Sequence, residues 1–204
     1  MKMKSKTVTV SENSGGISKA LALTEDTAKN SGLDKKAALH LRLLAEELFG
    51  MLSGIAGNVE ADYFIESDEK SFELHMKSDV KMTDEMHAQL LSVSKDGKNY
   101  AKKSFMGKIR VMIADFMSPE NRAPSQLMMD AAMPYTMGSA SADSAYIWSM
   151  VVYKNELNKR KSTAKEARDA WDELERSIVA NIADDVKVKI IGSSVEIIVF
   201  KAFN

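Results

Sequence analysis

The segment 37–57, AALHLRLLAEELFGMLSGIAG, constrains the fold of this chain most, because its apolar residues recur at helical spacing. The stripe consists of Leu41, Leu44, Leu48, Leu52 and Ile55, which lie three or four positions apart. We therefore predict a helix whose apolar side faces a core. The second half of the segment contains three glycines, each of which costs about 1 kcal/mol relative to alanine inside a helix. A helix that keeps them has something close to its backbone, either a packed sheet or a ligand.

Two neighbouring glutamates of this helix have different surroundings. Glu46 follows Arg42 by one helical turn, which is the spacing of an exposed ion pair worth about 0.3–0.5 kcal/mol. Glu47 lies at the edge of the apolar stripe, with Gly50 and Gly54 among its helical neighbours. A carboxylate in that position either lines a cleft or extends to water. We expect Glu46 to be solvated and treat Glu47 as the candidate functional acid.

Composition bounds the class of protein. A chain of 204 residues can bury a good core as one domain. Its net charge of −1 provides no field that would gather nucleic acid or anionic lipid. There is no cysteine and no uncharged apolar stretch of membrane-spanning length. We expect a cytoplasmic protein with no nucleic-acid or membrane partner.

No metal site is predicted from the histidines. His40, His75 and His87 are scattered, and none has a carboxylate or a second histidine at metal-binding spacing. A lone histidine of this kind is more often structural than catalytic. We therefore expect no metal ligands among them.

The first half of the chain alternates helix and strand signals. Residues 7–10 are typical of a strand, 17–31 of a helix ended by Gly32, and Asp34 can cap the helix of the opening segment. Two strands are predicted at 59–65 and 71–76, joined by an acidic turn at 66–70. This pattern predicts an α+β fold, a two-layer sandwich with a mixed or antiparallel sheet and helices on one face.

The second half is predicted to be helical until a final hairpin. Residues 84–117 favour helix, 118–144 form the one long irregular candidate, and 145–161 favour an aromatic-rich helix. Thr163 and Glu166 have the spacing of a capping box that would start a last helix through Ile178 and Ile182. Strands at 186–190 and 195–200 flank a turn at Gly192. We expect a single domain over 1–204, with 84–163 as a helical insertion in which 118–144 is either a lid or a plain connecting loop.

The sequence LRLLAEELFGMLSGIAG resembles the second helix of the histidine-kinase-like (GHKL) ATPase superfamily, in particular its small bacterial branch of anti-sigma serine kinases. The family's helix carries Glu-x-x-x-Asn, in which the Glu activates a water or hydroxyl and the Asn binds the magnesium on ATP. The resemblance assigns the first role to Glu47 and places Met51 at the asparagine position. Methionine offers no oxygen to magnesium, so an oxygen from Asn99, Asn121 or water would have to substitute. The order strand, helix, helix, hairpin and the closing helix with two strands are also those of the family.

Two further family motifs fall on recognisable positions. In the family, an Asp-x-Gly-x-Gly segment follows the second hairpin strand, and its Asp binds the adenine amino group. The corresponding residues here are 77–83, and the glycines are absent. Depending on register, Ser78 or Asp79 takes the adenine position. Gly138 is the nearest match to the glycine-rich turn that ends the family's ATP lid. The resemblance thus implies ATP and Mg²⁺ as ligands, with Asp79, Ser78, Gly138 and Met51 at the nucleotide.

Three interpretations remain open from the sequence. The first is an ATP-binding protein that phosphorylates a protein serine or regulates a partner. The second is a catalytically inactive relative that serves as a protein-binding regulatory module, with a protein partner and, as is common in the family, a homodimer. The third is an α+β domain whose similarity to the superfamily is accidental.

Overall fold

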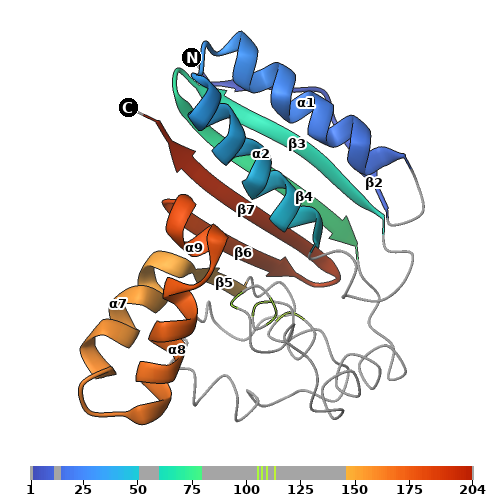
Figure 1. The fold of residues 1–204 in the computed structure, drawn as a ribbon. Helices are drawn as coiled ribbons and strands as arrows, with labels where there is room; N and C mark the ends of the chain where they lie inside the picture. The colour runs from blue at the N-terminus through green and yellow to red at the C-terminus, as the bar shows by residue number, and fades with distance from the viewer. Residues whose placement is uncertain are drawn as a thin grey trace.

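A computed structural model describes residues 2–11, 15–50, 60–79 and 146–203, together with the single positions 105, 107, 109 and 113. These residues form an antiparallel sheet with helices against it (Figure 1). The strands are β1 (Met3–Lys4), β2 (Val8–Val10), β3 (Ala61–Asp68), β4 (Ser71–Asp79), β5 (Tyr146–Ser149), β6 (Asp185–Ile191) and β7 (Ser194–Ala202). Their order in the sheet is β1-β3-β4-β7-β6-β5, and β2 also pairs with β3. The predicted α+β class with an antiparallel sheet is confirmed.

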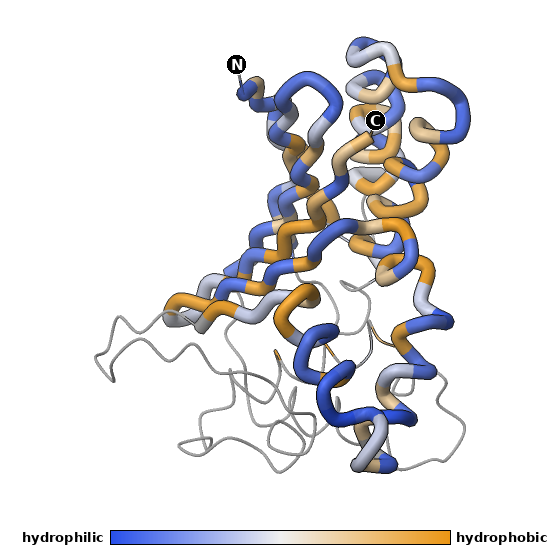
Figure 2. The backbone as a smooth tube through the Cα atoms, turned by 90° about the vertical axis from the view of Figure 1, so that its left-hand side faces the viewer, coloured by the Kyte–Doolittle hydropathy of each residue, from blue (hydrophilic) through white to orange (hydrophobic). Residues whose placement is uncertain are grey.

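The described helices lie on one side of this sheet. Helices α1 (Gly16–Asn30) and α2 (Lys35–Gly50) cross its face, and α9 (Ile178–Ile182) lies beside α2 (Figure 1). Helices α7 (Met150–Arg160) and α8 (Lys165–Glu175) pack together next to β5 and β6. Among the described residues no helix covers the opposite face (Figure 2). The core therefore lies between the sheet and the α1, α2 and α9 layer.

Alternation along the strands explains this layering. In β3 the buried residues Ala61, Tyr63 and Ile65 alternate with more exposed ones, which is the period of a strand with one face in a core. The predicted stripe of α2 packs against that face, with its described leucines, Leu41, Leu44 and Leu48, completely buried. Burial of each such side chain contributes about 1.5–3 kcal/mol. The stripe residues Leu52 and Ile55 lie outside the described part of the chain.

The predicted helix signals of the N-terminal half are confirmed. The Asp34 carboxylate accepts a hydrogen bond from Ala37 N at 2.8 Å, as expected of a cap. Gly32 follows α1 with a φ of 67°, a left-handed conformation that favours glycine at a helix end. Arg42 Nε donates to Glu46 Oε1 at 2.9 Å across one turn of α2. The β6–β7 turn likewise places Gly192 at a φ of 58°.

One expected helix begins later than the sequence indicates. Residues 146–149 form β5 against β6, with Trp148 opposite Val188, instead of the first turn of a helix over 145–161. Ile147 is exposed and Trp148 is 1% exposed, which is the period of a strand. A short apolar run does not distinguish strand from helix by itself. The boundary is Ser149, whose hydroxyl accepts from Val152 N and caps α7.

The predicted last helix and its capping box are also wrong in detail. The cap of α8 is Ala164, which makes no side-chain hydrogen bond, and the Thr163 hydroxyl donates to Arg160 O at 3.2 Å. The helix then ends at Glu175, and Ser177 starts α9 by accepting from Ala180 N at 3.3 Å. Two short helices replace one because this serine satisfies the free N–H groups of a new helix start.

The predicted hairpin turn is shorter than expected. Strand β3 continues to Asp68, so residues 66–68 of the expected acidic turn pair with β4 instead. In the predicted helical region 84–117, the described positions 105, 107, 109 and 113 are helical, and Phe105, Ile109 and Ile113 are buried. The expected irregular segment 118–144 lies outside the described residues. In the described part of the chain, no helix combines the length and apolarity needed to cross a bilayer.

Candidate functional site

The candidate acid Glu47 lies in the last turn of α2 and is half-buried. Its carboxylate makes no hydrogen bond or ion pair with another described residue, and burial, followed by the charge of Glu46, raises its pKa. Glu46 is exposed and bound to Arg42, which also contacts Glu25. Two consecutive glutamates therefore differ: Glu46 is a solvated ion-pair member, and Glu47 is a partly buried acid with no cation among the described residues.

Strand β4 carries the two candidates for the adenine position at its end. The Ser78 hydroxyl donates to Glu60 O at 2.6 Å, which fastens the end of β4 to the start of β3. Asp79 is exposed, and its side chain makes no hydrogen bond within the described part of the chain. Ser78 Oγ thus spends its proton on Glu60 O and keeps lone pairs that can accept, while the Asp79 carboxylate has no hydrogen-bond partner among the described residues.

Helix α2 and strand β4 end at the same end of the sheet (Figure 1). Glu47 and Asp79, which are 32 residues apart in sequence, are thus brought to one end of the molecule by the hairpin that β3 and β4 form. The two segments that continue from them include Met51 and lead on toward Gly138. Both of these predicted nucleotide residues lie outside the described residues.

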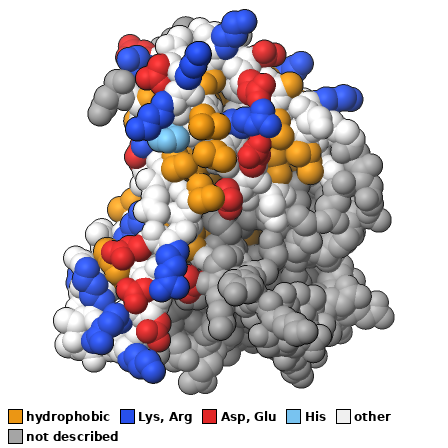
Figure 3. All heavy atoms as spheres, viewed as in Figure 1, with side chains coloured by type: hydrophobic (Ala, Val, Ile, Leu, Met, Phe, Trp, Pro, Cys, Tyr) orange, Lys and Arg blue, Asp and Glu red, His pale blue; other side chains and the backbone are white. Residues whose placement is uncertain are grey.

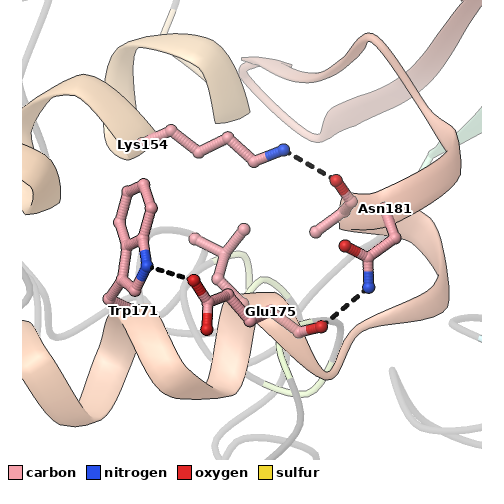
Figure 4. A pocket seen from close by; sticks show the side chains of 6 residues that line it. Lys154, Trp171, Glu175 and Asn181 are labelled. Carbon is pink, nitrogen blue, oxygen red and sulfur yellow. Dashed lines mark hydrogen bonds between the residues drawn. The ribbon is translucent and has the colours of Figure 1, made fainter.

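A groove of about 200 Å³ lies elsewhere, between α7, α8 and α9, and neither Glu47 nor Asp79 lines it (Figure 4). Lys154 Nζ donates to Ala180 O at 2.7 Å, and Asn181 Nδ2 donates to Glu175 O at 2.7 Å. Trp171 Nε1 donates to Glu175 Oε1 at 2.6 Å. These bonds join the three helices, so the polar groups of the groove are engaged with one another.

Lys154 is the unusual group of this groove. Burial lowers its pKa, although Asp185 and Asp184 act in the opposite direction. Its ammonium bonds a backbone carbonyl of the short helix α9 and makes no ion pair with a described acid. A lysine held in this way fixes α7 against α9 and keeps a larger share of neutral amine than an exposed lysine.

A cluster that the sequence analysis missed lies on the sheet face opposite the helices. His75 is 6% exposed, and its Nε2 lies 3.4 Å from Glu73 Oε2 and 3.9 Å from Glu66 Oε2. The statement that no histidine has a carboxylate at metal-binding spacing is therefore wrong for His75. The signal was present: residues two apart in a strand share a face, and the hairpin register places Glu66 opposite Glu73.

The helical face presents exposed apolar side chains among charged ones (Figure 3). Leu39 of α2 is 53% exposed and Ile178 of α9 is 48% exposed, although the two helices pack against each other. Apolar residues framed by charges on a helical layer are typical of protein-contact surfaces.

Comparisons of this chain with protein-family models, with curated proteins and with solved structures find no significant match.

Proposed function

We propose that this chain is an ATP-binding protein of the histidine-kinase-like ATPase fold that acts as a serine kinase or as a nucleotide-dependent regulator. The order of its elements supports the proposal. Strand β2, helices α1 and α2 and the β3–β4 hairpin follow one another at the start, and a helix followed by the β6–β7 hairpin closes the chain. This order is that of the superfamily the sequence resembles, and the helices lie on one face of the sheet (Figure 1).

The observation that carries the proposal is the state of Glu47. A half-buried carboxylate that has no cationic partner among the residues that the structure describes costs stability, since burial favours its neutral form. Groups of this kind are enriched at functional sites, where a raised pKa brings a carboxylate closer to the range of a general base. In the proposed reaction Glu47 accepts a proton from, or orients, the hydroxyl or water that attacks the γ-phosphate.

Asp79 provides the second element of the proposal. Its exposed carboxylate at the end of β4, which has no hydrogen-bond partner among the described residues, accepts a hydrogen bond from the adenine amino group. Phosphoryl transfer depends on positioning and on neutralising phosphate charge with magnesium. An oxygen ligand other than residue 51 would hold that ion, because methionine does not bind it.

The test compares two adjacent substitutions. Glu47→Gln is expected to abolish Mg²⁺-dependent phosphate release from ATP while ATP binding persists, whereas the matched control Glu46→Gln retains the activity, because its carboxylate already bonds Arg42. A third variant, Met51→Asn, restores the family's magnesium ligand and is expected to raise the activity. Equal activities of Glu47→Gln and Glu46→Gln would refute the catalytic role.

A second candidate function is a protein-binding regulatory module, favoured by the exposed Leu39 and Ile178 on the helical layer. On this alternative the chain binds its partner through α2, and nucleotide turnover is absent. A Leu39→Lys variant should then lose a complex that the wild-type chain forms in source cytosol, while retaining its fold by circular dichroism. A complex of unchanged yield with Leu39→Lys would exclude this surface.

A further inference from the structure

The β3–β4 hairpin places two acids directly opposite each other. Glu66 and Glu73 are register partners on the face away from the helices, with side chains 24% and 32% exposed. Like charges at opposed positions of a sheet destabilise it. Here a cation lies between them: Lys2 Nζ is 2.8 Å from Glu66 Oε2 and 2.9 Å from Glu73 Oε2. The hairpin therefore concentrates negative charge at a position that requires a positive partner.

His75 lies beside this acidic pair and completes a cluster of one histidine and two glutamates. His75 is 6% exposed, and its ring stacks on the ring of Phe64 with centroids 4.5 Å apart. Nδ1 lies 2.8 Å from Glu196 Oε1; because an ionised carboxylate only accepts, Nδ1 carries the proton and donates. In the neutral imidazole Nε2 then bears the lone pair, and this buried atom has no hydrogen-bond partner in the described part of the chain.

We propose that His75 Nε2 and the carboxylates of Glu66 and Glu73 bind a divalent transition-metal ion of the zinc class. The three residues offer ligand atoms that all lie within 4.8 Å of one another. Two ligands of a tetrahedral zinc ion with bonds of about 2.0–2.1 Å are separated by roughly 3.3 Å. The distances from Nε2 to the two carboxylate oxygens, 3.4 and 3.9 Å, need little adjustment to reach that value.

The surroundings of His75 fit this role. A metal-binding histidine commonly donates its other ring N–H to a carboxylate, which fixes the tautomer and the ring orientation. Glu196 is that carboxylate, and it contacts Lys189 in turn, at 3.6 Å. Imidazole with two carboxylates suits zinc and related ions, and the two carboxylates balance a divalent charge.

Lys2 is the competitor of the metal. Its ammonium binds the same two oxygen atoms that would ligate the ion, and this contact lowers the pKa of Glu66 and raises that of Lys2. Lys2 precedes β1 and is half exposed, so it can leave without disturbing the core. Metal binding thus displaces the Lys2 side chain, which joins the residue before β1 to β3 and β4. This site is on the face opposite Glu47 and α2, and it does not depend on the proposed nucleotide function.

The test is calorimetric titration of the tag-free full chain with zinc chloride. One ion per chain is expected, with binding lost in His75→Gln and retained in the matched control His40→Gln, which changes a histidine of α2. Glu196→Gln should weaken binding by about 10–100-fold, since it removes the carboxylate that orients the ring. Lys2→Ala should tighten binding severalfold, because it removes the competing ammonium.

His75 is buried, so its replacement can alter folding as well as remove a ligand. Glu73→Gln changes a partly exposed ligand and therefore tests the zinc site independently of folding. Loss of zinc binding in Glu73→Gln with an unchanged circular dichroism spectrum supports the site. Zinc binding that is absent in the wild-type chain, or that persists in both His75→Gln and Glu73→Gln, would overturn the proposal. An unchanged affinity for zinc in Lys2→Ala would refute competition between Lys2 and the metal.

Discussion

The buried hydrogen bond between Thr24 and Tyr63 is expected to show an unequal response to removal of its two partners. Both residues are completely buried, and their hydroxyl oxygens lie 2.7 Å apart between α1 and β3. The Thr24 hydroxyl donates its single proton to Ala20 O at 2.8 Å, so it accepts the proton of Tyr63. Tyr63 therefore depends on Thr24 more than Thr24 depends on Tyr63.

The magnitudes follow from this direction. Thr24→Val leaves the Tyr63 hydroxyl buried without an acceptor, which costs about 1–3 kcal/mol. Tyr63→Phe leaves the threonine with its bond to Ala20 O, so the loss is that of an ordinary hydrogen bond, about 0.5–1.5 kcal/mol. In the double variant an apolar pair replaces the polar one, and the cost should be less than the sum of the two.

Urea unfolding of the four proteins, followed by circular dichroism, measures these differences. For a chain of this size each kcal/mol corresponds to a shift in Tm of about 2–4 °C, so thermal scans provide an independent check. A larger loss in free energy of unfolding for Tyr63→Phe than for Thr24→Val would contradict this hydrogen-bond direction. So would a double variant whose loss equals the sum of the two single losses.

Three further outcomes follow from single groups. Burial raises the pKa of Tyr153 from 10.0 to about 12, so the unfolded chain loses this proton at a lower pH than the folded chain does. The free energy of unfolding should therefore fall as the pH rises between those two values. Urea titrations of Tyr153→Phe at alkaline pH should show a smaller fall. Because burial lowers the pKa of Lys154, an amine-selective acylating reagent should modify it with a pH midpoint below the usual range of lysine. A midpoint within that range, measured by mass spectrometry, would contradict this. Asp34→Ala should destabilise α2 by about 1 kcal/mol, since it removes the cap on Ala37 N, and an unchanged urea midpoint would refute that role.

The sequence predicted the elements whose signals are local. The structure confirms the elements that depend on neighbouring residues: Leu41, Leu44 and Leu48 of the α2 stripe, the cap at Asp34, the glycine at the end of α1 and the two hairpins. The predictions are wrong where a partner distant in sequence determines the secondary structure of a segment. Residues 146–149 become a strand because they pair with the edge of β6, whose partner residues lie about 40 positions further along the chain.

The candidate sites likewise divide into features with a local sequence signal and features that depend on distant partners. The contrast between Glu46 and Glu47 was predictable, since both lie on one helix and their neighbours follow from its period. The cluster of His75 with Glu66 and Glu73 was not recognised, because it needs both the two-residue period of a strand and the register of the hairpin. The contribution of Glu196 comes from β7, which a local pattern does not place beside β4.

Calorimetric titration of the purified chain with ATP tests whether nucleotide binds at the end of the sheet where α2 and β4 end. We expect micromolar binding with magnesium, weaker binding with EDTA, and a marked loss of affinity in Asp79→Asn compared with the control Asp68→Asn at the other end of the hairpin. Absence of heat at millimolar ATP, with and without magnesium, would contradict the claim and leave the protein-binding function of the helical face.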